Sequence, residues 1–155
     1  VMPVDENLLT AEDVWMNYLL RKSRYTLLYD PSALEWHHRR NSPKKFLRQM
    51  YRFAIGRLQV VKKAPRLLNV FHMVAGFSIP LFVAIVITAL YFQFMILLVW
   101  VISGLIIGMM LMAWFHYRRL AVAWCMPLMA VLFCMGWSAG FLRELIIPMA
   151  DAQGK

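Results

Sequence analysis

The sequence has no charge over its middle third. No Asp, Glu, Lys or Arg occurs between Arg66 and Arg118, a gap of 51 residues. Because one crossing of a bilayer takes about 20 apolar residues, the gap is too long for one span and fits two. Only 16% of the residues are charged and 61% are hydrophobic, whereas soluble domains are about 25% charged. The chain is therefore predicted to be a membrane protein.

Cysteine is scarce as well. Cys125 and Cys134 are the only two, and they lie nine residues apart in an apolar stretch. Neither their spacing nor their neighbours match a zinc site. Both are therefore predicted to be small hydrophobic packing residues, and no metal site is predicted on them.

A signal peptide is also missing, because no short apolar run follows a basic start. The chain opens at Val1 without an initiator methionine, and residues 1–66 are too few for a robust independent core. We expect the N-terminus to be the cut edge of a larger protein. A processed small protein is the alternative.

Positive charge is concentrated just before the apolar region. Ten Lys or Arg and no acidic residue occur from Arg39 to Arg66. The net charge of +9 would suit nucleic acid. Basic clusters beside a membrane span, however, mark the cytoplasmic side and contact anionic lipid headgroups. Membrane lipids are therefore a predicted partner, and nucleic acid is not.

Residues 11–22 are predicted to form a helix. Thr10 is the predicted N-cap, because its hydroxyl can accept a bond from a free backbone amide. Glu12 and Asp13 lie in the first turn, where negative charge suits the helix dipole.

Residues 24–29 and 33–37 are predicted to be two short strands, since Tyr, Thr and Leu are frequent in the first of them. Asp30-Pro31-Ser32 between them is typical of a turn. The pattern indicates an α/β remnant over residues 1–42.

A long helix is predicted from Pro43 to about Lys63, with Ser42 as its cap. Its residues divide into an apolar face and a basic face, which makes it amphipathic. The apolar face holds Leu47, Met50, Tyr51, Ala54, Leu58 and Val61, and the basic face holds Lys44, Lys45, Arg48, Arg52 and Lys62. Residues 43–66 are predicted to lie along the membrane interface. An ordinary surface helix of a soluble domain is the alternative.

The region 67–143 contains three apolar segments, at about 68–91, 94–117 and 120–142. Pro80 is the predicted kink of the first segment, and Phe92-Gln93 is a predicted tight reversal. Because basic residues flank the first two segments on both outer ends, these segments are predicted to form a hairpin with both ends in the cytoplasm.

The third segment is long enough to cross again, which would place the polar tail 144–155 outside the cytoplasm. Half insertion is the alternative, because Pro127, Gly136 and Gly140 weaken this helix. Gly136 and Gly140 form a GxxxG pair, and so do Gly104 and Gly108. Both pairs are predicted to pack within the bundle, with dimerisation as the alternative.

Three motifs follow one another ahead of the hairpin. They are Glu12-Asp13, the run at 25–33, and Gln49-x-x-Arg52-Phe53. In this order they resemble the C-terminal half of membrane-bound family 2 glycosyltransferases, which build bacterial exopolysaccharides or glycolipids. The motifs are similar to that family's ED pair, its strand–turn–strand and its QxxRW motif, with Phe in place of Trp.

Segments 48–57 and 136–143 are similar to the succinoglycan-type members, and the resemblance extends from Asp5 to about Leu142. It implies that residues 1–42 are a remnant of a GT-A domain. The predicted fold class is thus a membrane α-helical bundle of about three transmembrane helices, preceded by an interfacial amphipathic helix and an α/β remnant.

The resemblance also implies roles for individual residues in an inverting sugar transfer. Asp13 is the expected general base, and Glu12 is expected to orient it or to bind the acceptor. Arg52 is expected to stabilise the leaving diphosphate, although contact with a lipid headgroup is the alternative. Gln49 and Phe53 are expected to line the acceptor or nucleotide edge.

The implied partners are a nucleotide-sugar donor and a lipid-linked or glycan acceptor. A divalent metal, Mg²⁺ or Mn²⁺, is implied as cofactor, but the family's DxD segment lies upstream of the ED pair, so its ligands are mostly absent here. The chain is therefore expected to be inactive alone. The implied location is the bacterial cytoplasmic (inner) membrane, multi-pass, with the catalytic part facing the cytoplasm. His37 and His38 are expected to be polar strand-end residues.

Two other classes of function remain as alternatives. A non-enzymatic membrane anchor or assembly subunit would dock partners through basic residues 39–66. A transporter fragment is disfavoured. The predicted spans of this chain contain no Asp, Glu, Lys or Arg, and such residues usually line an ion or substrate pathway.

Overall fold

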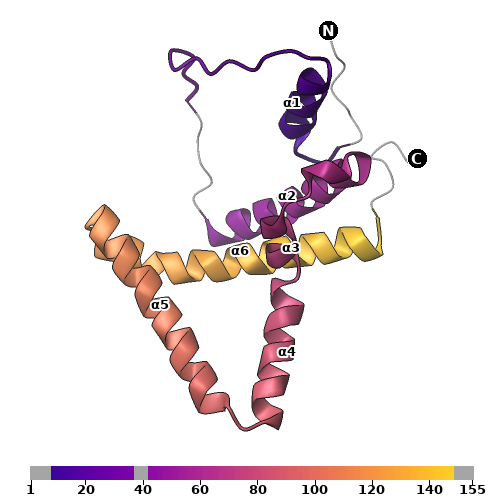
Figure 1. Ribbon diagram of the computed structural model, residues 1–155. Helices are drawn as coiled ribbons and strands as arrows, with labels where there is room; N and C mark the ends of the chain where they lie inside the picture. Colours follow the sequence, from indigo (N-terminus) through magenta and orange to yellow (C-terminus); the bar gives the residue numbers. More distant parts are fainter. Residues whose placement is uncertain (1–7, 37–41, 149–155) are drawn as a thin grey trace.

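The computed structural model describes residues 8–36 and 42–148. Every regular element in these residues is helical: α1 (Glu12–Lys22), α2 (Pro43–Lys63), the 3-10 turn η1 (Pro65–Leu67), α3 (Val70–Gly76), α4 (Ser78–Tyr91), α5 (Met95–Tyr117) and α6 (Leu120–Ile146). Figure 1 shows a layered arrangement, with α1 above α2, α6 beneath α2, and α4 and α5 projecting away from α6 as the arms of a V.

The two predicted strands are wrong in the part of the chain that the structure describes. Residues 25–36 form an irregular segment, and Leu28, Tyr29 and Trp36 are exposed on it. A strand is stabilised by the ladder to its neighbour, and this segment makes none within residues 8–36 and 42–148. The α/β remnant predicted for residues 1–42 is therefore not found. His37 and His38 lie outside the described residues.

The turn inside this segment forms as predicted. The Asp30 carboxylate accepts hydrogen bonds from the Ser32 hydroxyl at 2.7 Å and from the Ser32 amide at 2.9 Å. These two bonds favour the charged carboxylate and hold the pKa of Asp30 below its usual range.

Helix α1 also forms as predicted, but the expectation that Thr10 caps it is wrong. The capping position is Ala11, which has a left-handed backbone with φ of 67° and no side-chain cap. The Thr10 hydroxyl instead donates to a backbone carbonyl of α2. The helix is where the sequence predicted it. Thr10 does not cap it, because the Thr10 hydroxyl makes a tertiary contact with α2.

Helix α2 begins and ends as predicted. The Ser42 hydroxyl accepts from the Lys45 amide at 3.3 Å, and Pro43 occupies the first helical position. The apolar face of α2 is buried, but α6 rather than lipid covers it. Ala54, Leu58 and Val61 form the core of the molecule together with a side chain of α6, Phe141.

Helices α2 and α6 run in the same direction and approach closely at two glycines of α6 (Figure 1). A Cβ on Gly136 would lie 2.7 Å from the Leu47 carbonyl oxygen, and one on Gly140 would collide with the Tyr51 carbonyl oxygen. The pair Gly136 and Gly140 therefore packs within the bundle, as predicted. The same prediction is wrong for Gly104 and Gly108, because a Cβ on either would meet nothing within 4 Å in the described chain.

The first apolar segment is bent, but three residues before the predicted position. Helices α3 and α4 meet at Phe77 with an angle of 58°. Pro80 lies in the first turn of α4, where a missing amide is tolerated. Because residue 80 has no amide, the Gly76 carbonyl lacks its usual helical donor, and the Ser138 hydroxyl of α6 donates to it at 2.8 Å.

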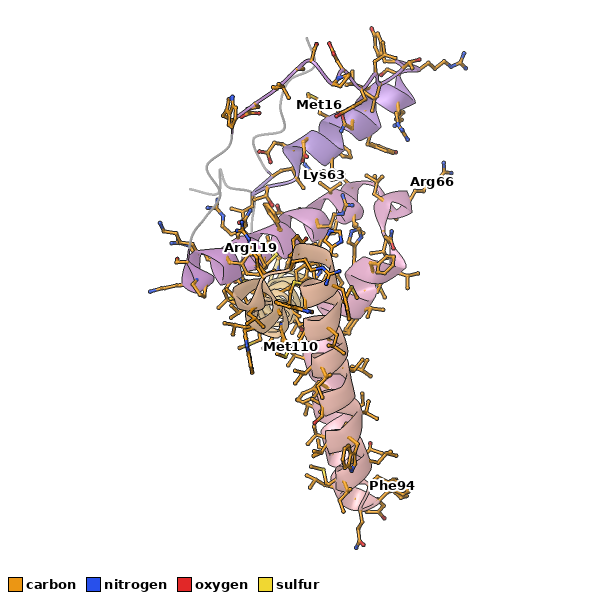
Figure 2. All side chains as sticks on the ribbon, turned by 90° about the vertical axis from the view of Figure 1, so that its left-hand side faces the viewer. Met16, Lys63, Arg66, Phe94, Met110 and Arg119 are labelled. Atoms are coloured by element: carbon orange, nitrogen blue, oxygen red, sulfur yellow. The ribbon has the colours of Figure 1, made fainter. Side chains whose placement is uncertain are left out.

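The long apolar helices agree with a membrane protein. By length and composition, α5 and α6 are each able to cross a bilayer, and the bent pair α3–α4 makes a third candidate if it is one span. With 23 residues, α5 is about 34 Å long. Phe94 lies at the far tip of the hairpin, whereas Lys63, Arg66 and Arg119 lie at its other end (Figure 2).

The two GxxxG pairs allow a matched test of the α2–α6 contact. Gly140→Ala is expected to lower the free energy of unfolding by about 1–3 kcal/mol, because the new methyl group overlaps the Tyr51 carbonyl. Gly104→Ala should be neutral or stabilising by about 0.5–1 kcal/mol, since Ala is the better helix former. Denaturant titration in detergent micelles, followed by tryptophan fluorescence, measures both. Equal stability of the two variants would contradict the packing.

The hydrogen bond from the Ser138 hydroxyl to the Gly76 carbonyl predicts that Pro80→Ala reduces the loss of stability caused by Ser138→Ala. Ser138→Ala is expected to cost about 1–3 kcal/mol, because it leaves the Gly76 carbonyl buried without a donor. Adding Pro80→Ala restores a backbone amide four residues after Gly76, so the serine substitution should cost less in that background. The same titration on the four proteins of the cycle gives the coupling. If Ser138→Ala costs as much stability in the Pro80→Ala background as in the wild type, the Ser138 hydroxyl does not replace the missing amide of residue 80.

Candidate functional site at the contact of α1 with α2

The residues singled out in the sequence lie on two elements that meet. Glu12 and Asp13 occupy the first turn of α1 and are exposed. Arg52 and Phe53 are exposed on α2, and Gln49 lies half-buried one turn before them. Four of the five side chains are therefore open to solvent, and that of Gln49 is partly shielded.

The start of α1 is fixed to α2 beside Arg52. The Thr10 hydroxyl donates to the Arg52 carbonyl at 3.0 Å, and the Leu9 amide donates to the Gln59 side-chain oxygen at 3.0 Å. Two helix turns of α2 therefore hold the residues immediately before the Glu12-Asp13 pair. The structure brings the beginning of α1 and the Arg52 turn of α2 together.

Gly56 makes this contact possible. A Cβ at this position would collide with the Thr10 hydroxyl and would lie 2.5 Å from the Thr10 carbonyl oxygen. Any side chain on residue 56 therefore forces the start of α1 away from α2. Further along, the Lys63 ammonium lies 5.8 Å from the Trp15 ring centroid, which adds a second attachment between the two helices.

The two sides of α2 have different neighbours. Ala54, Leu58 and Val61 pack on α6. Arg52, Gly56 and Gln59, at spacings of four and three residues, share the other side and contact the chain leading into α1. The basic amphipathic pattern predicted the buried side correctly. It did not indicate that the polar side holds a second helix.

The described residues do not supply a metal site by themselves. Within residues 8–36 and 42–148, no group of three or more His, Cys, Asp or Glu side chains could hold an ion. Glu12 and Asp13 are the acidic pair at the candidate site, and a divalent cation needs several oxygen ligands. The described residues therefore do not fit the divalent metal that the resemblance implies.

A partly buried ion pair, which the sequence did not predict, joins the C-terminal ends of α2 and α6. The Lys62 ammonium lies 2.7 Å from a carboxylate oxygen of Glu144 and also donates to the Glu144 carbonyl at 2.9 Å. The Glu144 side chain is 2% exposed and that of Lys62 is 40% exposed. The available signal was an isolated acidic residue near the end of an apolar helix, where it needs a cationic partner.

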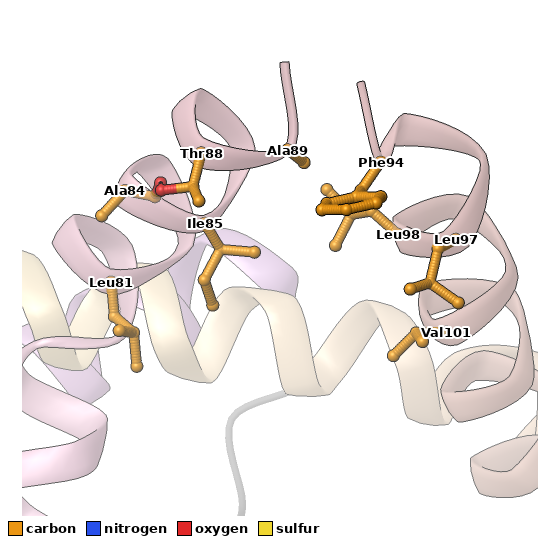
Figure 3. Close-up of a pocket in the computed structure, with 9 residues that line it drawn as sticks. All are labelled: Leu81, Ala84, Ile85, Thr88, Ala89, Phe94, Leu97, Leu98 and Val101. Atoms are coloured by element: carbon orange, nitrogen blue, oxygen red, sulfur yellow. Dashed lines mark hydrogen bonds between the residues drawn. The ribbon is translucent and has the colours of Figure 1, made fainter. Parts of the chain in front are cut away.

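An apolar groove of about 470 Å³ lies between the arms of the V, well away from Glu12 and Asp13 (Figure 3). Its lining comes from α4 and α5: Leu81, Ala84, Ile85, Thr88, Ala89, Phe94, Leu97, Leu98 and Val101. The one hydroxyl among them, on Thr88, donates to the Ala84 carbonyl within α4. Such a lining suits hydrocarbon and offers nothing to a charged nucleotide.

Comparisons of the chain with protein-family models, with curated proteins and with solved structures find no match.

The role of Gly56 gives a direct test of the site's geometry. Gly56→Ala is expected to separate the start of α1 from α2 at a cost of about 1–3 kcal/mol, so the amides of α1 should exchange with deuterium about five- to 150-fold faster. Gly108→Ala is the matched control, because a Cβ there meets nothing. Unchanged exchange in α1 of the Gly56→Ala protein would show that this contact does not hold the helix.

Proposed function

We propose that the chain is the membrane-docked part of an enzyme that transfers a sugar, with inversion, from a nucleotide-sugar to a lipid-linked or glycan acceptor at the cytoplasmic face of the inner membrane. One observation carries the proposal. The hydrogen bond from Thr10 to the Arg52 carbonyl joins the segment before Glu12-Asp13 to the helix that bears Gln49, Arg52 and Phe53. This contact between the two elements supports the proposal that the motifs resembling the family's ED and QxxRW motifs act together.

The chemistry assigned to these residues is a single displacement. The Asp13 carboxylate takes the proton of an acceptor hydroxyl while the hydroxyl oxygen forms a bond to the anomeric carbon. The bond from that carbon to the diphosphate oxygen breaks, and the nucleoside diphosphate leaves with the bonding electrons. Glu12 orients Asp13 or the acceptor, and the guanidinium of Arg52 stabilises the departing negative charge.

Exposure supports these assignments. A general base must come within hydrogen-bond reach of its substrate, and both carboxylates of the pair are open to solvent. Arg52 and Phe53 are open as well, so a diphosphate and a sugar ring can reach them.

A non-enzymatic anchor or assembly subunit is the second candidate. It is favoured by the exposed basic residues Lys44, Lys45 and Arg48 in the first two turns of α2. These side chains could dock an acidic partner without any chemistry at Asp13. Sugar transfer requires the Asp13 carboxylate, whereas an anchor does not.

Asp13→Asn separates them in the natural full-length protein. Membranes containing the wild type should release nucleoside diphosphate from at least one of a panel of UDP- and GDP-sugars. Asp13→Asn should lower that release by about 100-fold or more, which is the usual contribution of a general base. Membrane content of the protein, measured by immunoblotting, should stay the same.

Asp30→Asn is the matched control. It removes another exposed carboxylate whose recorded partners are both within Ser32, so release should be unchanged. Full activity of the Asp13→Asn protein removes Asp13 from the role of base. Absence of release by the wild type with every donor sugar favours the anchor.

A further inference from the structure

We infer that α6 does not cross the bilayer: it lies in the plane of the membrane under α2, with its exposed apolar face in the hydrocarbon of one leaflet. The segment α3–α5 is then the inserted element, and both ends of the described chain lie on the same side. This differs from the third crossing predicted from length and hydropathy. It does not depend on the proposed sugar transfer.

The first step is the attachment of α6 along α2. Gly136 lies against Leu47, Gly140 lies against Tyr51, and Glu144 pairs with Lys62. Residue numbers increase together on both helices, so the contact runs along them and not across a single point. Two helices attached over this length share one depth in the membrane.

The second step is the depth of α2. This helix carries seven Lys or Arg residues, at positions 44, 45, 48, 52, 57, 62 and 63. Several of them are exposed, and cations exposed to hydrocarbon are strongly disfavoured. Helix α2 must therefore stay in the headgroup layer, and α6 stays beside it.

The third step is the direction of the hairpin. Helices α4 and α5 leave α6 on the side opposite α2 and run crosswise to it (Figures 1 and 2). They belong to the stretch of 51 residues without charge. With α5 in the bilayer, α6 lies crosswise to the membrane normal.

The last step is the surface that α6 leaves open. Trp124, Leu128, Val131 and Met135 are exposed, and Trp124 most of all, at 70%. At spacings of three and four residues they form one stripe on the helix. The stripe has no charge, and the exposed side chains of α4 and α5 are mostly apolar as well, so acyl chains of the near leaflet are its partner.

Sidedness of single cysteines tests the inference. In the full-length protein, with Cys125, Cys134 and any other native cysteine replaced by alanine, Ser32→Cys and Pro148→Cys are introduced separately. Sealed membrane vesicles of each orientation are treated with a membrane-impermeant maleimide. Both positions should label in the same orientation, to at least ten times the level in the opposite one.

Every other pattern contradicts the inference. Labelling of Pro148→Cys in the orientation that protects Ser32→Cys means that α6 crosses. Protection of Pro148→Cys in both orientations means that the end of α6 is buried, although the structure leaves this position exposed. Detergent-treated membranes, in which both should label, control for access.

A crosslink gives an independent measurement. The Lys62 ammonium reaches the Glu144 carboxylate, so a thiol crosslinker about as long as the two side chains should join Lys62→Cys to Glu144→Cys in intact membranes. A crossing α6 places these positions on opposite sides of the bilayer, where the crosslinker cannot join them. The pair Lys62→Cys with Gln93→Cys, from α2 and the hairpin tip, is the control that should not crosslink.

Discussion

The rest of the structure depends on the close contact between α2 and α6. Gly136 and Gly140 allow the two backbones to approach, and Phe141 of α6 fills the core with Ala54 and Leu58 of α2. The same stretch of α6 presents Ser138 to the Gly76 carbonyl, which holds the bend between α3 and α4. The stretch of α6 from Gly136 to Phe141 thus positions α2 and also holds the bend at which α4 begins.

Charge explains why this contact has to lie at the membrane surface. Each Lys or Arg at the bilayer centre costs about 2.5–3.5 kcal/mol on insertion scales. For the seven on α2 the sum is on the order of 20 kcal/mol, more than the whole stability of a typical domain, which is about 5–15 kcal/mol. Packing cannot offset such a cost. The uncharged stretch 67–117 has no such penalty, so it is the part that enters the lipid.

Local signals in the sequence predicted the helices well. Ser42, Pro43 and the 3.6-residue period defined α2, because caps and amphipathicity act within one element. The strands failed because a strand needs a partner that local pattern does not reveal, and residues 25–36 have none in the described chain. The bend was misplaced for a related reason. A proline shows that one backbone amide is missing. Where the helix bends depends on which other donor reaches the carbonyl left without a partner, and here that donor is the Ser138 hydroxyl.

For the candidate site, the sequence could indicate candidate residues but not how the elements that carry them meet. Short motifs marked Glu12, Asp13 and Arg52, yet they could not place α1 on the polar side of α2. That placement comes from Thr10 and Gly56, whose types are ordinary in a loop and a helix. The basic face of an amphipathic helix is usually exposed to water. In α2 part of this face contacts the start of α1 and the rest is exposed. As a result, the first turn of α1, which carries Glu12 and Asp13, is held beside the Arg52 turn of α2. Helix α2 holds α1 on this side while α6 covers its apolar side.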